Sequence, residues 1–140
     1  MSITLEHARA VVDGAIAKAR DLELKPVSVV VLDDRGSLVA AASEDGVSAM
    51  RARIAHGKAN AAIQLGMGTR ALMNRAEQQA YFIQAMNGLA GGDMVPVPGG
   101  VLLRDGSGEL LGAVGTSGDT SDNDEAAALG AACLVLVCGG

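Results

Sequence analysis

The sequence predicts an α+β fold in which helices flank a mainly antiparallel sheet. Two pairs of short apolar segments are each joined by a tight turn rich in Asp and Gly, which is typical of antiparallel hairpins. Helical apolar patterns lie before, between and after these pairs, so helices are expected to pack on the sheet. With 140 residues and a hydrophobic share of 49%, residues 1–140 are expected to form one domain.

The chain begins with a predicted helix and hairpin. Apolar residues recur at helical spacing from Thr4 to Leu22, and Thr4 is a suitable N-cap. Residues 27–32 are β-branched and predict a buried strand, and residues 37–43 predict the strand that returns. The turn between them contains Gly36, which closes such a loop at little steric cost.

A long helix is predicted next, from about Ala49 to Leu65, with Ser48 as its cap and Gly66 at its end. At 100° per residue its larger apolar side chains define one buried stripe, which consists of Met50, Ile54, Ala61 and Leu65. Arg51 and Lys58 are expected at the margin of that stripe.

The second half of the sequence predicts a helix, a hairpin and a last helix. The helix runs from about Arg70 to Asn87 with Thr69 as its N-cap, and a Gly- and Pro-rich connector follows. Residues 101–104 and 109–115 are expected to pair as the second hairpin. The last helix is predicted from Glu125 to about Val137.

Composition excludes several classes of protein. The chain has one Tyr, one Phe and no Trp, so it has few aromatic rings on which bases could stack. It has 16 acidic residues against 11 basic ones, so it lacks the excess of positive charge that binds a phosphate backbone. Nucleic acid is therefore not an expected partner. No apolar stretch approaches the roughly 20 residues that cross a bilayer, and no signal-peptide pattern is present, so no membrane partner and a cytoplasmic location are expected. Cys133 and Cys138 are expected to be reduced thiols.

The glycine-rich segment from Gly112 to Gly118 is the strongest local feature. It is expected to run from a strand to a helix N-terminus, where outward backbone N–H groups suit a ligand carboxylate or propionate. The spacing matches neither G-x-G-x-x-G nor a P-loop. In the alternative interpretation the glycines only permit a turn, and acidic residues cap the helix, namely Asp119, Asp122 and Asp124.

A second candidate cluster lies on the long helix. Burying Lys58 near an apolar stripe is costly unless its ammonium is paired, which suggests that Arg51 and Lys58 clamp a carboxylated ligand. His56 on the same helix is a candidate acid, base or metal ligand, since histidine serves in all three roles. Alternatively, the two cations pair with carboxylates such as Asp124, and His56 is a surface residue. Two histidines and two late cysteines offer little for zinc, so no metal site is expected.

Six segments form a pattern that covers nearly the whole chain in order: residues 29–38, 45–46, 55–59, 98–100, 112–118 and 123–128. In these segments the chain resembles the GlcG/HbpS-type haem-binding family, and also the C-terminal domain of PduO-type cobalamin adenosyltransferases. Two positions depart from the family pattern: Leu102 replaces a frequent proline, and Thr116 stands where valine is common.

The resemblance implies a five-stranded antiparallel sheet in profilin-like α/β/α layers and assembly as a homo-oligomer. Residues 93–98 are the best candidate for a fifth strand. The positions that match the family pattern are Lys58, Gly99, Gly100, Gly115, Ser117, Gly118, Asp124 and Glu125.

The leading functional hypothesis is a small-ligand-binding protein that takes haem or another carboxylated ligand, with no other cofactor. The available haem ligands are His56, Met50 and Met86. The expected ligand-binding residues are Arg51, Lys58, Gly99, Gly100, Gly115, Thr116, Ser117, Gly118 and Glu125. The alternative is a cofactor-independent lyase or isomerase for a small carboxylated catabolic metabolite, with His56, Lys58 and Asp124 as catalytic residues. A purely structural oligomer subunit is the third option.

Overall fold

The computed structural model describes residues 1–135 and 137–139, and side chains as far as Ala132. Its helices are α1 (Leu5–Asp21), α2 (Ala49–Leu65), α3 (Thr69–Gln78), α4 (Ala80–Leu89) and α5 (Ser121–Val135). Its strands are β1 (Ser28–Asp33), β2 (Leu38–Ser43), β3 (Gly100–Arg104), β4 (Leu110–Ser117) and β5 (Val137–Gly139). The side chains of Cys133 and Cys138 lie outside the described part, so their reduced state stays a prediction.

All paired strands of the sheet are antiparallel, in the order β2-β1-β4-β3-β5. Both predicted hairpins are confirmed, because β1 pairs with β2 and β3 pairs with β4. The prediction of five comparable strands is slightly off. Four strands of five to eight residues form the sheet, and β5 adds only three residues beside β3.

The expected fifth strand at residues 93–98 is wrong. This segment lies along α2 instead of at a sheet edge. The Val95 N–H donates to the Gly57 carbonyl at 3.1 Å, and the Asn60 amide donates to the Asp93 carbonyl at 2.8 Å. The backbone groups that a strand would use are therefore taken by the helix.

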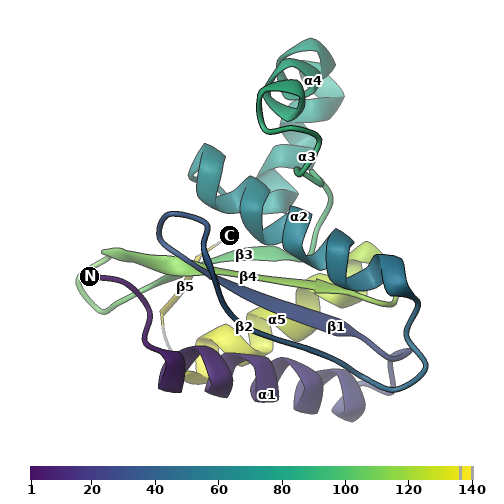
Figure 1. The fold of residues 1–140 in the computed structure, drawn as a ribbon, viewed down its shortest axis with the longest axis vertical. Coiled ribbons are helices and arrows are strands. Elements are labelled where there is room, and N and C mark those ends of the chain that lie inside the picture. Colours follow the sequence, from purple (N-terminus) through teal and green to yellow (C-terminus); the bar gives the residue numbers. More distant parts are fainter. Residues whose placement is uncertain (136, 140) are drawn as a thin grey trace.

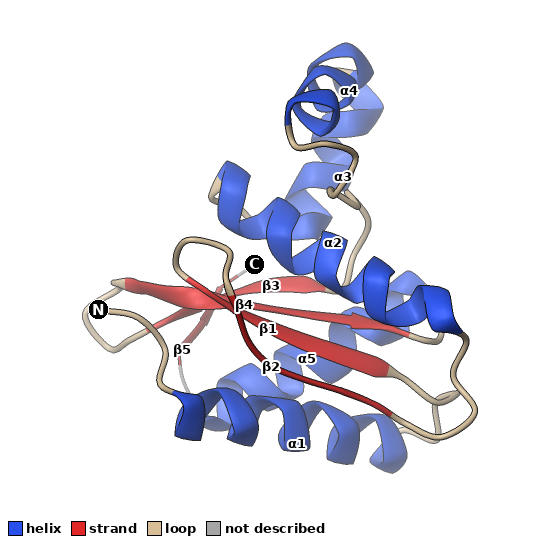
Figure 2. Cartoon of the chain, in the orientation of Figure 1, coloured by secondary structure: helices blue, strands red, loops and turns tan. Residues whose placement is uncertain are grey.

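Helices cover both faces of the sheet, which gives the α/β/α layers that the family resemblance implies. Figure 1 shows α2 above the sheet and α1 with α5 side by side below it. The α3–α4 pair projects away from the sheet beyond α2, as the colouring by secondary structure in Figure 2 also shows. Among the described residues, no helix combines the length and the apolar character that a membrane span requires.

Two predicted helix boundaries are wrong. The helix expected over 70–87 is broken at Gln79, whose φ of −138° and ψ of 59° are not helical, and α4 then begins at Ala80. No Gly or Pro marks this break in the sequence. The last helix begins at Ser121 rather than Glu125, because the Thr120 hydroxyl accepts the Asn123 N–H at 3.2 Å and caps an earlier turn. By contrast, the Thr4 cap of α1 is confirmed.

The face that α2 turns to the sheet differs from the predicted stripe. Met50 is 53% exposed, whereas the residues that α2 buries are small, apart from Lys58. They are Ala55, Gly57, Ala59, Ala61 and Ala62. Side-chain size is a poor guide to burial here, because α2 packs against the sheet through its smallest residues.

Glycines in the sheet make this close packing feasible. The segment Gly112–Gly115 lies inside β4, paired with β1 on one side and β3 on the other, as the predicted strand 109–115 requires. The strand continues to Ser117, two residues beyond its predicted end. A Cβ added at Gly115 would collide with the Ala55 carbonyl oxygen and lie 2.9 Å from the Ala59 nitrogen. The α2 backbone thus rests directly on β4.

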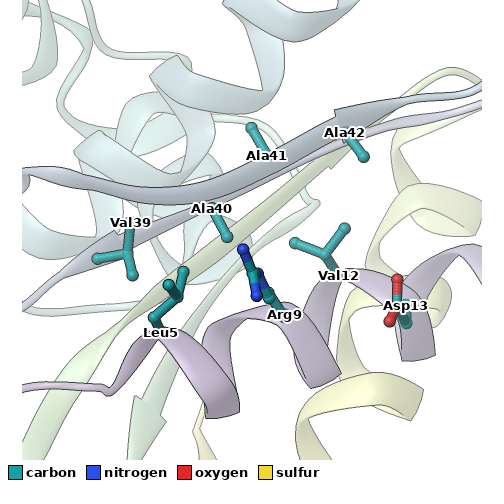
Figure 3. A pocket seen from close by; sticks show the side chains of 8 residues that line it. All are labelled: Leu5, Arg9, Val12, Asp13, Val39, Ala40, Ala41 and Ala42. Atoms are coloured by element: carbon teal, nitrogen blue, oxygen red, sulfur yellow. The ribbon is translucent and has the colours of Figure 1, made fainter.

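The edge strand β2 is only partly covered. Residues 38, 41 and 43 are exposed, and residues 39, 40 and 42 are half-buried. Figure 3 shows a groove between β2 and α1, of about 400 Å³, into which Leu5, Arg9, Val12 and Asp13 project from the helix.

Replacement of Gly115 by alanine tests the contact between α2 and β4. We expect Gly115→Ala to lower the free energy of unfolding by about 3 kcal/mol, because the added methyl group meets backbone that cannot rotate away. Urea unfolding followed by circular dichroism measures the loss. Gly106→Ala is the control, since nothing lies within 4 Å of a Cβ there, and it should change stability by no more than about 0.5 kcal/mol. Equal effects of the two substitutions would contradict the packing argument.

Candidate functional site

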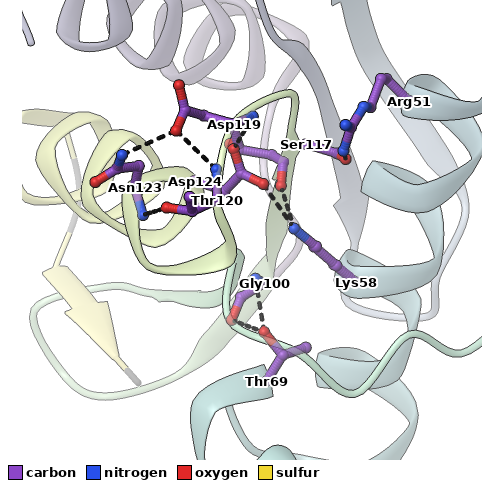
Figure 4. A network of polar contacts seen from close by, with 10 residues as sticks. Arg51, Lys58, Thr69, Gly100, Ser117, Asp119, Thr120, Asn123 and Asp124 are labelled. Atoms are coloured by element: carbon purple, nitrogen blue, oxygen red, sulfur yellow. Dashed lines mark hydrogen bonds and ion pairs between the residues drawn. The ribbon is translucent and has the colours of Figure 1, made fainter. Parts of the chain in front are cut away.

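Lys58 joins three elements through a buried ammonium group. Its side chain is 2% exposed, and Nζ donates to the Thr116 carbonyl at 2.9 Å and to Asp124 Oδ2 at 3.0 Å (Figure 4). Asp124 is itself 1% exposed. Burial lowers the pKa of Lys58, the Asp124 carboxylate opposes this shift, and the Arg51 guanidinium adds to it. The pair connects α2 to β4 and to the first turn of α5.

The acidic segment before α5 is organised by its own backbone. Asp124 Oδ1 accepts the Asp119 N–H at 2.9 Å, and Asp119 accepts N–H groups from Lys25, Thr120 and the Asn123 side chain. The bond from the Lys25 backbone is the main cause that lowers the pKa of Asp119 to about 2. Asp119 and Asp124 thus bond backbone N–H groups before α5, close to the role that the alternative gives them, but Thr120 is the cap of the helix and Asp122 pairs with Arg70.

The double glycine surrounds the Lys58 side chain. Gly99 has φ of +129°, and a Cβ there would lie 2.8 Å from Lys58 Nζ. The Gly100 N–H donates to the Thr69 hydroxyl at 2.8 Å, and a Cβ on Gly100 would meet the Lys58 carbonyl. These glycines therefore let the loop before β3 close over the buried lysine.

Arg51 faces a separate, small pocket. Its Nη1 donates to the buried Ser117 hydroxyl at 3.3 Å. The pocket has a volume of about 230 Å³ and is lined by Lys25, Pro26, Gly46, Val47, Ser48, Arg51 and Gly118. Ser48 makes no side-chain cap to α2, and no acidic residue occupies the first turn of that helix. The pocket therefore combines two cations with a helix N-terminus that has no acidic neighbour in its first turn.

His56 lies on another side of α2, at an apolar pocket. Its Nδ1 lies 2.9 Å from Asp93 Oδ2, and both side chains are partly exposed. The pocket has a volume of about 410 Å³ and is lined by Val30, Leu38, Ala41, Ala52, Arg53, His56 and Asp93. Because Asp93 engages Nδ1, the imidazole has Nε2 available for a ligand.

The structure brings some predicted site residues together and separates others. Lys58 and Asp124 meet, with the Thr116 carbonyl beside them, and Arg51 meets Ser117 and Gly118 at the small pocket. His56 belongs to neither group.

Three other predicted residues lie outside both groups. Glu125 receives both of its hydrogen bonds from Arg70 Nε, at 2.9 and 3.0 Å. Of the other two predicted haem ligands, Met50 lies near Arg53 at the exposed start of α2, and Met86 lines a pocket between α2 and α4.

Sequence reasoning missed three polar partners of the site. Asp93, which contacts His56, lies in the segment expected to form the fifth strand, so nothing in the sequence places it beside α2. Lys25 precedes Pro26, where the sequence indicates only a loop. Thr69 is a predicted helix cap, yet its hydroxyl bonds Gly100. In the described part of the chain, no three His, Cys, Asp or Glu side chains are grouped so that they could hold a metal ion.

Comparisons with known proteins place this geometry in a family context. A family model described as haem-degrading protein HbpS-like matches residues 3–132. The crystal structure of a PduOC–haem complex matches with a TM-score of 0.86 at 22% identity, over 99% of this chain and 98% of that chain. The structure of HbpS matches at 0.80 and 24%, over 96% and 91%. Protein ORFY of Klebsiella pneumoniae matches at 0.82 and 26%, over 94% and 88%. No curated protein matches the chain.

Removal of the Lys58 ammonium should leave Asp124 buried without its partner. We expect Lys58→Met to lower the free energy of unfolding by about 3–5 kcal/mol, and Lys58→Met with Asp124→Leu to recover much of that loss. Urea titration with circular dichroism measures both variants. Lys18→Met is the matched control, because Lys18 contacts Asp21 at 3.8 Å on the surface and should contribute under about 1 kcal/mol. A Lys58→Met variant as stable as the control would refute a connecting role.

Proposed function

The chain belongs to the HbpS-like haem-degrading protein family, and from this premise we propose that it binds haem and that His56 would hold the haem iron. The observation that carries the proposal is the placement of His56 at the wall of an apolar pocket, with Asp93 on its Nδ1. The PduOC structure, whose fold this chain shares, is a haem complex and supports the same ligand class.

The side chains around His56 fit such a group. Four of the seven lining residues are aliphatic, and the volume of about 410 Å³ lies within the range of small-molecule sites. A carboxylate on one imidazole nitrogen fixes the ring and strengthens the other nitrogen as a donor. When bound, haem supplies an iron centre that accepts such a donor and carries redox chemistry.

The chain's own residues then divide the binding work. Val30, Leu38 and Ala41 exclude water from one face of the ligand, since they belong to the sheet beneath α2. Arg53 stands in the same lining and offers a guanidinium to a propionate. Asp93 holds the ring orientation of His56.

Titration with haemin tests the role of His56. We expect the unmodified protein to give a saturable Soret shift, and His56→Ala to bind at least about tenfold more weakly with a displaced Soret band. Asp93→Asn should weaken binding by about tenfold, because it removes the carboxylate that orients the ring.

His7→Ala serves as the matched control, since His7 lies in the first turn of α1 and does not line this pocket. Circular dichroism checks that each variant is folded. The proposal is wrong if the unmodified protein shows no saturable shift, or if His56→Ala keeps the affinity and the spectrum of the parent.

A small carboxylate at the Arg51 pocket is a second candidate function. Arg51 and Lys25 line this pocket, and neither forms an ion pair with another described residue. A volume of about 230 Å³ excludes a porphyrin and admits a small acid. The Lys58 ammonium bonds the carbonyl of Thr116, the residue before Ser117, and it also bonds Asp124. A proton shared by Lys58 and Asp124 is the basis for the cofactor-independent lyase or isomerase alternative.

Ligand-dependent melting tests this second candidate. Glycolate, acetate and succinate are each added at constant ionic strength, with chloride as the reference anion. We expect at least one to raise the Tm by a few degrees, as mass action requires for a ligand well above its Kd. Arg51→Ala should abolish the rise, whereas Arg35→Ala, in the exposed β1–β2 turn, should keep it. A rise that survives Arg51→Ala, or no rise with any of the acids, would exclude the pocket.

A further inference from the structure

We propose that β2 is a dimerisation edge, at which the β2 strands of two copies of this chain pair antiparallel across a twofold axis. β2 is the outer strand of the sheet on the side away from β5. An edge strand presents unpaired backbone donors and acceptors that template pairing with another strand. Three features favour a second copy as the partner. They are the outward backbone groups of β2, the absence of charge and Pro along the strand, and the charges on α1 beside it.

The β1–β2 register identifies the free backbone groups. The Glu44 N–H donates to the Val27 carbonyl at 3.0 Å, so this position is a hydrogen-bonded pair of the antiparallel ladder. Hydrogen-bonded and non-hydrogen-bonded pairs alternate along such a ladder. The pairs Ser28↔Ser43 and Val30↔Ala41 are therefore of the second kind. Ala41 and Ser43 turn their N–H and C=O groups to the open edge.

Residues 40–43 of β2 pair with β1 in regular register, and the one irregularity of this ladder, which leaves Val39 without a partner in the register, lies before them. Residues Leu38–Ser43 include no charged residue, no Pro and no Gly, and Leu38 is 62% exposed. Pockets of about 400 and 410 Å³ lie on the two faces of the same strand. Leu5, which is 48% exposed, lines the pocket on the α1 side. Apolar surface thus continues from the free backbone to both layers of helices.

Charge complementarity selects a second copy as the occupant. Arg9 and Asp13 lie one turn apart on α1, line the pocket below β2 and are both exposed (Figure 3). These two described side chains form no ion pair with each other, although their i,i+4 spacing permits one. A twofold axis passing between them places Arg9 beside the partner's Asp13, and Asp13 beside the partner's Arg9. The surface is therefore complementary to itself, as an isologous interface requires.

The first experiment measures the mass of the haem-free protein by sedimentation equilibrium over micromolar concentrations. We expect a dimer or an even multiple of it. Ala41→Pro should weaken association by about tenfold or more, since it removes an outward N–H without breaking a β1–β2 bond. Amide hydrogen exchange adds a local readout, because Ala41 and Ser43 should be protected only at concentrations where the protein is associated.

Charge exchange tests the partner without altering the backbone. Arg9→Asp or Asp13→Arg alone should weaken the dimer roughly tenfold through like-charge contacts, and the double exchange Arg9→Asp with Asp13→Arg should restore it. Glu77→Arg, which replaces an exposed carboxylate on α3, is the control and should leave the mass unchanged.

Several outcomes would overturn the proposal. A monomer or an odd-numbered oligomer excludes the twofold pairing, as does a folded Ala41→Pro variant with the parent's association constant. If Ala41→Pro does not fold, single charge reversals that leave the mass unchanged exclude the pairing in its place. Association only with a foreign peptide strand, without self-association, also excludes a second copy as the occupant.

Discussion

The close approach of α2 to the sheet is the constraint on which the rest of this structure depends. The Lys58 ammonium reaches a backbone carbonyl on β4 and a carboxylate on α5 because the α2 backbone comes close to the sheet at Gly100 and Gly115, where no side chain separates them. Gly115 supplies that clearance under Ala55, and Gly100 supplies it under the Lys58 backbone. A buried ion pair is weak evidence for stability, but its geometry is demanding. Here it fixes the position of α2 along the sheet and ties it to the start of α5.

The position of α2 determines where its other polar residues point. With the small residues and Lys58 directed inward, Arg51 reaches toward Ser117 at one end of the sheet. His56 emerges toward β1 and β2, beside Asp93. The Arg51 pocket and the His56 pocket therefore both include residues of α2 but open on different sides of that helix. Both pockets lie at the surface, because the inner face of Ala and Gly packs directly against the strands.

The sequence predicted the features that depend on local periodicity and turn chemistry. Both hairpins and the first helix follow from such signals, and the structure has them. The buried face of α2 could not be predicted by ranking side chains by size, because Met50 is exposed while Ala55 is fully buried. The break at Gln79 carries no Gly or Pro signal. In the candidate site, the cost of burying an unpaired ammonium pointed to the Lys58–Asp124 pair as one of two alternatives. Asp93 could not be found in this way, because it lies 37 residues from His56 and only the folding of its connector along α2 brings the two together.

The edge strand β2 connects the haem site with the dimer. Leu38 and Ala41 line the His56 pocket, and the same strand carries the outward backbone groups of Ala41. A second copy paired there would add a wall to the pocket that a single chain leaves open. Any ligand contact with that wall would make haem binding stronger in the dimer, and by thermodynamic reciprocity haem would then strengthen the dimer by the same factor. With one Tyr, one Phe and no Trp, the chain has few large side chains that could cover a flat ligand bound at this surface pocket. Assembly at β2 would supply the missing enclosure.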